Sequence, residues 1–170
     1  GHVARLLAER GDRVRALLRP SSDTRAVRDL PVEQVTGDLR DPASLDRALA
    51  GVDAVFHVAA DYRLWAANPS EIYDSNVGGT RNLLAAAQRA GVKRFVYTSS
   101  VATVAVHRPG RLPDEDVDSR LEEMIGHYKR SKFMAEQEAL RAAAEGAPVV
   151  VVNPTTPVGP GDWKPTPTGK

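Results

Sequence analysis

Tyr128 and Lys132 are the residues whose types and spacing most directly suggest chemistry in this sequence. They are four positions apart, and positions i and i+4 of a helix lie one above the other on the same face. A lysine cation beside a phenol favours the phenolate and lowers the pKa of the tyrosine, which can then exchange a proton with a carbonyl or hydroxyl group. The same spacing also arises by chance. The pair therefore predicts a catalytic site only if the rest of the chain builds a site for a dinucleotide.

The composition is that of a single globular domain, and it excludes several classes of function. The 170 residues are 42% hydrophobic, enough for a core, and the net charge of +1 gives no electrostatic footprint for a nucleic acid or an anionic membrane. There is no cysteine, and the four histidines show no metal-ligand spacing, so no metal site is predicted. No apolar run approaches the ~20 residues of a membrane span and no signal peptide opens the chain, which predicts a cytoplasmic protein.

Helices and strands are predicted to alternate regularly along the chain. The predicted helices cover 3–10, 22–30, 41–50, 68–90 and 120–145, and the predicted strands cover 13–18, 32–36, 54–60, 93–99 and 149–152. Such alternation with apolar strands predicts an α/β fold, a Rossmann-type doubly wound parallel sheet. Two adjacent glycines, Gly78 and Gly79, weaken the helix over 68–90, so they indicate the close approach of a ligand or a neighbouring backbone.

Unusual clusters of residues follow the predicted strands. In open α/β sheets, ligands bind at the carboxyl ends of the strands. The clusters at these ends are Arg19-Pro20, Gly37-Asp38-Leu39, Ala59-Ala60, Thr98-Ser99-Ser100 and Asn153-Pro154. Their common placement predicts a binding site along this edge of the sheet, next to the helix that carries Tyr128 and Lys132.

Six segments, in this order, resemble the extended short-chain dehydrogenase/reductase superfamily, also called the NAD-dependent epimerase/dehydratase family. They are an adenine-binding segment at 35–41, a strand end at 56–60, a helical asparagine segment at 76–80, a serine-bearing strand end at 97–100, the Tyr-x-x-x-Lys pair at 128–132 and a nicotinamide and substrate segment at 153–162. More narrowly, 61–65, 126–128 and 153–160 resemble the hopanoid-associated sugar epimerases, which lie close to the dihydroflavonol-4-reductase-like branch.

The resemblance implies a role for each matched position. Ser100, Tyr128 and Lys132 would be catalytic, with Tyr128 as general acid/base and Ser99 as the alternate to Ser100. The implied cofactor-binding residues are Gly1, Arg19, Asp38, Leu39, Ala59, Ala60, Asn76, Ser99, Tyr128, Lys132, Asn153 and Pro154. Tyr62, Trp65, Ser100 and Asn153 would contact the substrate. The plainer alternatives are a strand-end turn for Ser99-Ser100 and ordinary packing for Tyr62 and Trp65.

The sequence departs from the family pattern at two places, which affect the expected bounds of the domain and the expected cofactor. The glycine-rich fingerprint and its strand are absent, so Gly1 is either the last fingerprint glycine or the residue after it. We therefore expect a Rossmann domain, residues 1–162, that is truncated at both ends, with 163–170 beginning a substrate-binding region. Arg19 stands where NAD-selecting members carry an acid, and an arginine can pair with a 2′-phosphate, which favours NADP over NAD. The alternative is that Arg19 is a solvated loop cation.

The expected function is hydride transfer by an NAD(P)-dependent epimerase or oxidoreductase, on a hydroxyl or ketone of a nucleotide-sugar-like substrate. One alternative is an NADPH-dependent ketone reductase of the dihydroflavonol-reductase type. Another is a non-catalytic dinucleotide sensor, although such proteins usually lose the tyrosine or the lysine. The expected partner is a small-molecule substrate, and the resemblance also suggests a possible homodimer.

Overall fold

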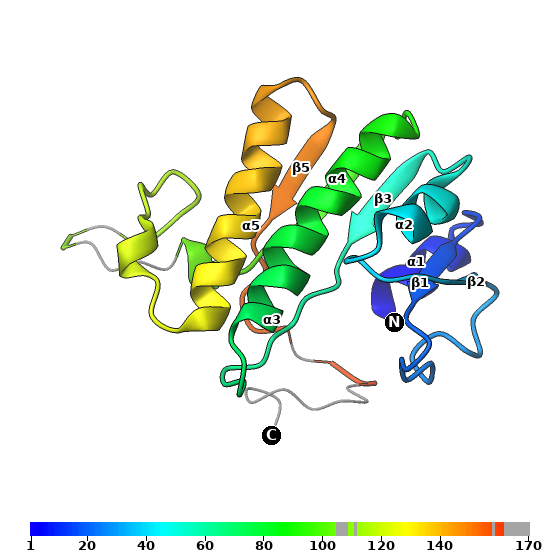
Figure 1. Cartoon of the computed structure of the whole chain (residues 1–170), viewed down its shortest axis with the longest axis horizontal. Helices are drawn as coiled ribbons and strands as arrows, with labels where there is room; N and C mark the ends of the chain where they lie inside the picture. Colours follow the sequence, from blue (N-terminus) through cyan, green and yellow to red (C-terminus); the bar gives the residue numbers. More distant parts are fainter. Residues whose placement is uncertain (105–108, 111, 158, 162–170) are drawn as a thin grey trace.

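The strands of the computed structural model form two parallel sheets (Figure 1); the structure describes residues 1–104, 109–110, 112–157 and 159–161. Strand β1(Arg15–Leu18) pairs with β2(Glu33–Thr36). The other sheet has the order β3(Ala54–His57), β4(Arg94–Thr98), β5(Val149–Val152). The parallel α/β prediction is confirmed. The described residues record no pairing between β1 and β3, so the expected single sheet is divided at that point.

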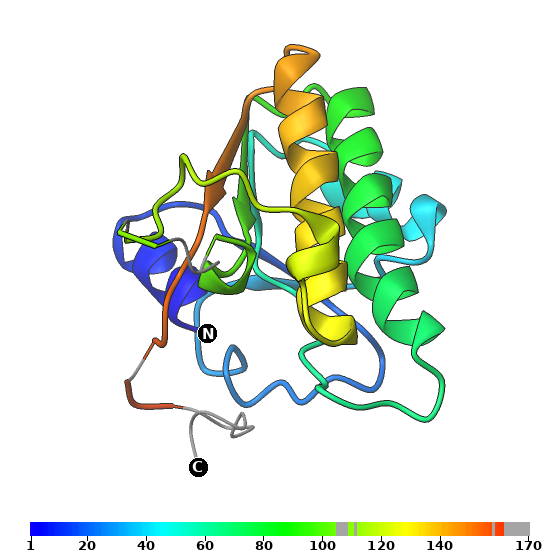
Figure 2. The same cartoon turned by 90° about the vertical axis from the view of Figure 1, so that its left-hand side faces the viewer.

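Helices lie on both sides of the strands. The helices are α1(His2–Glu9), α2(Pro42–Leu49), α3(Ser70–Tyr73), α4(Gly79–Arg89) and α5(His127–Ala144). Figure 2 shows α4 and α5 side by side on one face of the three-stranded sheet, with α1 on the other side. In the described part of the chain, no helix combines the length and apolar character that a membrane crossing requires.

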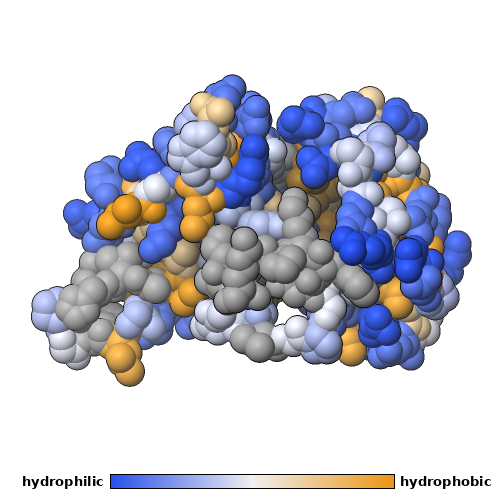
Figure 3. All heavy atoms as spheres, turned by 90° about the horizontal axis from the view of Figure 1, so that it is seen from below, coloured by the Kyte–Doolittle hydropathy of each residue, from blue (hydrophilic) through white to orange (hydrophobic). Residues whose placement is uncertain are grey.

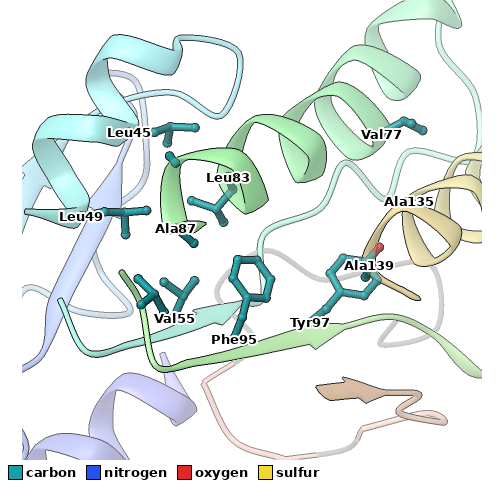
Figure 4. Packing of buried hydrophobic residues seen from close by; sticks show 12 residues of the cluster. Leu45, Leu49, Val55, Val77, Leu83, Ala87, Phe95, Tyr97, Ala135 and Ala139 are labelled. Atoms are coloured by element: carbon teal, nitrogen blue, oxygen red, sulfur yellow. The ribbon is translucent and has the colours of Figure 1, made fainter. Parts of the chain in front are cut away.

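The core lies between the three-stranded sheet and the helices α2, α4 and α5. Phe95 and Tyr97 are two positions apart on β4, so both side chains point into the core, and each residue is 1% exposed. Figure 4 shows them facing Leu83 of α4 and the small residues Ala135 and Ala139 of α5. Because alanine side chains are short, α5 can approach the sheet closely. Full burial of each large apolar side chain contributes roughly 2–3 kcal/mol, so this packing fixes where the residues of α5 meet the end of β4.

The helical segment predicted over 68–90 is continuous but contains a π-helical turn, η1(Asp74–Gly78), between α3 and α4. At its start, Asn68 Oδ1 accepts a hydrogen bond from Ser70 N at 3.2 Å. The glycine pair has two different environments. A Cβ added to Gly79 would lie 2.8 Å from Leu39 Cβ, whereas a Cβ on Gly78 would meet open space. The close approach inferred from the glycines is therefore a contact of Gly79 with the loop after β2.

Two helix predictions are wrong. Residues 25–29 form turns and no helix. Asp23 Oδ1 accepts from Arg25 N as a cap would, but the backbone bonds that follow are mostly of the i+3 type, and the i+4 bond from Arg28 N to the Thr24 carbonyl oxygen is not continued into a helix. The helix predicted from 120 begins at His127, because Gly126 adopts φ 84°, a left-handed conformation that ends helical geometry. Before it lies only a 3₁₀ turn, η3(Leu121–Glu123).

Candidate active site

Lys132 occupies a buried position at the carboxyl end of β4. Its side chain is 3% exposed, and Nζ donates to Tyr97 Oη at 3.0 Å and to the Thr98 carbonyl oxygen at 2.9 Å. Burial lowers the pKa of Lys132 to about 8, and the nearby Glu136 opposes this change. An ammonium carries three N–H donors, and the described residues engage two of them, so they leave one for a ligand.

Tyr128 lies in the first turn of α5, one helical turn before Lys132. It is half-buried, and its carbonyl oxygen accepts a hydrogen bond from Ser131 Oγ at 2.8 Å. The pKa of Tyr97 is raised, first by burial and then by the neighbouring Glu136 and Tyr128. Tyr97, at the end of β4, is therefore linked to both residues of the predicted pair: it accepts a hydrogen bond from Lys132, and Tyr128 is one of the groups that raise its pKa.

Ser100 follows β4 and begins the 3₁₀ turn η2(Val101–Thr103). Its Oγ accepts from Ala102 N at 3.2 Å, and its carbonyl oxygen accepts from Thr103 N at 3.0 Å. The hydrogen bonds of the described residues use the Ser100 hydroxyl as an acceptor, so its proton can be donated to a substrate oxygen. Ser99, the alternate, is buried, and its N–H donates to the Val152 carbonyl oxygen at 2.8 Å.

Asn76 connects the loop after β3 to α5. Its Nδ2 donates to Ser131 Oγ and to the Asp61 carbonyl oxygen, each at 2.9 Å, and its Oδ1 accepts from Asp61 N at 2.7 Å. A buried amide with these bonds is well suited to support the site. Direct contact of Asn76 with a cofactor stays a prediction.

Asn153 turns its amide toward the protein interior. Nδ2 donates to Glu136 Oε2 at 2.7 Å, to Thr103 Oγ1 at 2.9 Å and to the Ser100 carbonyl oxygen at 3.3 Å. The neighbouring Pro154 carbonyl oxygen accepts from Val101 N at 3.0 Å. These contacts join the end of β5 to the Ser100 turn, and contact of Asn153 and Pro154 with cofactor or substrate stays a prediction.

The predicted adenine end of the site lies near the ends of β1 and β2. Arg40 pairs with the Asp38 carboxylate at 2.7 Å and holds the pKa of Asp38 down to about 2, with a smaller contribution from Arg19. Leu39 packs against Gly79, and its carbonyl oxygen accepts from Asn82 Nδ2 at 2.9 Å. Arg19 is exposed, at the same edge as Asp38.

The remaining predicted residues lie around the same edge. Ala59 and Ala60 follow β3 and are exposed, so their short side chains leave the backbone accessible. Trp65 is 79% exposed, which disagrees with ordinary core packing, whereas Tyr62 is half-buried. Gly1 precedes α1 and lies against Ala26. In Figure 3, viewed from below, the part of this side that is drawn in colour is mostly hydrophilic with separate apolar patches.

Sequence reasoning missed the buried polar residues that surround Lys132. His57 is 3% exposed, its Nε2 lies 2.9 Å from Thr80 Oγ1, and burial together with Lys132 lowers the pKa of His57 to about 3. Glu136 is 7% exposed and follows Lys132 by four residues, a spacing that places both on one face of α5. That spacing was a usable signal for Glu136. For His57 there was no comparable signal, because it lies within the apolar run predicted as a strand over 54–60.

Comparisons with known proteins show the family to which the sequence is similar. The model of the NAD dependent epimerase/dehydratase family matches residues 1–170. A Synechocystis protein provisionally named dihydroflavonol 4-reductase is 51% identical over 169 residues, 99% of this chain and 49% of that protein. The Escherichia coli O157:H7 protein named N-acetyl-alpha-D-glucosaminyl-diphospho-ditrans,octacis-undecaprenol 4-epimerase is 42% identical over 123 residues, 70% of this chain and 35% of that protein.

A solved structure gives the same fold. The crystal structure of gox2253 superimposes with a TM-score of 0.91 at 50% identity, over 98% of this chain and 51% of that one. The chain thus spans about half the length of the first curated relatives it matches.

Proposed function

The chain belongs to the NAD dependent epimerase/dehydratase family, and on this basis we propose that the full-length protein is an NAD(P)-dependent enzyme acting at a hydroxyl or ketone of a nucleotide-sugar-like substrate. The observation that carries the proposal is the position of Lys132 at the end of β4. It is bonded there to Tyr97 Oη and the Thr98 carbonyl oxygen, with Tyr128 one helical turn away. A buried cation therefore lies at the strand end that precedes Ser100, one helical turn from Tyr128.

Each residue has a defined task in this proposal. Tyr128 exchanges the proton at the substrate oxygen as general acid/base. Lys132 provides a positive charge one helical turn from Tyr128. The Ser100 hydroxyl donates a hydrogen bond to the same substrate oxygen and holds the reacting carbon in line. Because β4, η2 and α5 are fixed by packing, these groups are positioned before the substrate arrives.

The residues present fit a nicotinamide dinucleotide, which when bound supplies the hydride donor or acceptor. The third N–H of Lys132 is suited to a ribose hydroxyl, and the short side chains of Ala59 and Ala60 leave room for a flat ligand beside β3. Asp38 and Leu39 would lie at the adenine end. The exposed guanidinium of Arg19 supports a preference for NADP, since it can pair with a 2′-phosphate.

A reductase of the dihydroflavonol type is the second candidate, favoured by the 51% identity to the Synechocystis protein. The two activities differ in their net use of cofactor. Purified full-length protein is mixed with NADPH and a dihydroflavonol and, in a separate reaction, with NADP⁺ and UDP-N-acetylglucosamine. Loss of NADPH absorbance with the dihydroflavonol supports the reductase. An epimeric sugar detected by NMR without net formation of NADPH supports the epimerase, because the hydride taken up by NADP⁺ is returned to the sugar. A protein that binds neither NADP⁺ nor NAD⁺ in a calorimetric titration contradicts both.

A further inference from the structure

Glu136 is a buried carboxylate at the meeting point of three elements. It lies on α5 with 7% of its surface exposed. Its Oε2 accepts from Thr103 Oγ1 at 2.8 Å and from Asn153 Nδ2 at 2.7 Å. A buried carboxylate is costly unless it is hydrogen-bonded and faces a positive charge. These contacts supply the hydrogen bonds, and they come from the turn after β4 and from the end of β5.

The same contacts reach Ser100. Thr103 Oγ1 lies 2.8 Å from the Ser100 carbonyl oxygen, and Asn153 Nδ2 lies 3.3 Å from it. The single hydroxyl proton of Thr103 is therefore shared between Ser100 and Glu136, while Asn153 Nδ2 donates to Thr103 Oγ1 at 2.9 Å. Glu136 thus holds two side chains that both contact the backbone of the proposed catalytic serine.

Lys132 supplies a positive charge one helical turn from Glu136. The two residues are one helical turn apart on α5, and both are buried. In the described residues, the titratable groups with an electrostatic or hydrogen-bonding link to Lys132 are Tyr97 on β4, His57 on β3 and Glu136 on α5. His57 and Tyr97 are neutral near pH 7, because burial lowers the pKa of His57 and raises that of Tyr97. Glu136 is the group among them that can carry a negative charge.

We propose that Glu136 is a positioning residue, which keeps Lys132 as an ammonium and fixes the Ser100 turn against α5 through Thr103 and Asn153. This inference rests on the proposed function, since it assigns a task to Glu136 in that reaction. It also makes a physical statement about Lys132 that holds without any substrate. Removal of the negative charge leaves the buried ammonium with less compensation, so Lys132 loses its proton at lower pH.

The test compares Glu136→Gln with the unchanged full-length protein. The titration of Lys132 is followed by NMR of the lysine ¹³Cε signals without cofactor, with the signal assigned by its loss in Lys132→Arg. We expect the midpoint for Lys132 to move about one pH unit lower in Glu136→Gln. Turnover falls about tenfold to a hundredfold, the size expected for one charge-assisted hydrogen bond, with KM changed less than threefold. The alkaline limb of the turnover profile moves to lower pH in parallel.

Three further variants separate a positioning role from a merely structural one. Glu136→Asp keeps the charge and restores the Lys132 midpoint. Thr103→Val removes the hydroxyl that bonds to Ser100, Glu136 and Asn153, so it lowers turnover, but it leaves the titration midpoint of Lys132 unchanged. Glu145→Gln, an exposed carboxylate just beyond α5, changes neither.

Two results overturn the inference. One is a folded Glu136→Gln protein whose Lys132 midpoint and pH profile match the unchanged protein. The other, should Glu136→Gln fail to fold, is a Thr103→Val variant with unaltered turnover. A third outcome is possible: the Lys132 midpoint moves in Glu136→Gln, but the unchanged protein turns over none of the substrates tested. That outcome supports the electrostatic link between Glu136 and Lys132 and contradicts only the proposed function.

Discussion

At the scale of single residues, Tyr128 and Lys132 share one face of α5 but differ in surroundings. Lys132 is buried and held by two oxygen atoms of β4, whereas Tyr128 is half-buried at the start of the helix. A proton-transferring group must reach the substrate, and a group that supplies charge acts best where water is excluded. In the proposed mechanism the two tasks therefore fall to a half-buried tyrosine and a buried ammonium.

Removal of the Tyr128 hydroxyl tests this division. In the full-length protein, we expect Tyr128→Phe to lower turnover by a factor of ~10²–10⁴, the usual contribution of a general acid/base. Cofactor affinity should stay nearly unchanged, because the ring and Lys132 remain. Tyr73→Phe is the matched control, since the Tyr73 hydroxyl lies 3.1 Å from His127 Nδ1 at the same end of α5. A Tyr128→Phe enzyme with undiminished turnover would rule out the mechanism.

Arg19 offers a test of cofactor choice. Its guanidinium is exposed near Asp38, so it is available for a 2′-phosphate. A charge-assisted contact with phosphate contributes roughly 1.5–3 kcal/mol. We therefore expect Arg19→Asp in the full-length protein to change the ratio of the NADP⁺ and NAD⁺ dissociation constants about tenfold to a hundredfold, toward NAD⁺. Arg28→Asp, on the same exposed loop, is the control, and an unchanged ratio in Arg19→Asp would make Arg19 a bystander.

At the scale of elements, the adjacent glycines at the η1–α4 junction give opposite predictions. Gly79→Ala places a methyl group 2.8 Å from Leu39 Cβ, so we expect a loss of roughly 1–3 kcal/mol in unfolding free energy. Gly78→Ala places its methyl group in open space at φ −58°, ψ −47°, so we expect a gain of roughly 0.5–1 kcal/mol. Urea unfolding of the two full-length variants measures both. Equal effects of the two substitutions would show that the contact with Leu39 does not constrain this junction.

The elements that could be predicted from the sequence are those whose ends are marked by neighbouring residues. Asp41 caps α2 and Pro42 opens it, as the sequence indicated, because a cap involves neighbouring residues only. The late start of α5 depends on the left-handed φ of Gly126, which the sequence permits but does not require. The network of Glu136 depends on bringing β4, β5 and α5 together. Such polar contacts between distant segments cannot be read from local patterns.

At the scale of the whole molecule, the alternation of helices and strands was enough to predict parallel strands with the site at their carboxyl ends. The division between β1 and β3 agrees with the strand order of the Rossmann fold, in which one further strand separates these two. A side-chain contact ties β1 to the end of α2, the helix that leads to β3: Arg15 donates to the carbonyl oxygens of Ala48 and Ala50 at 2.7 and 3.0 Å.

This division predicts how the 170-residue chain behaves when expressed by itself. In the described residues, β1 and β3 are not paired with each other. In the three-stranded sheet, the apolar residues Phe56 and Val150 are 42% and 47% exposed. A buried backbone group left without a partner costs about 1–3 kcal/mol, against a total domain stability of only ~5–15 kcal/mol. Stability of this piece should therefore be marginal.

We expect calorimetry of the 170-residue chain to show no cooperative unfolding transition whose midpoint rises with NADP⁺. The full-length protein, measured beside it, should show one, because a ligand that binds only the native state raises its stability. Because the same NADP⁺ is added to both proteins, the comparison distinguishes low stability of the 170-residue chain from low affinity of NADP⁺. A cooperative transition of the short chain that rises with NADP⁺ would mean that the two sheets already form a complete cofactor site, and that β1 and β3 need no strand between them.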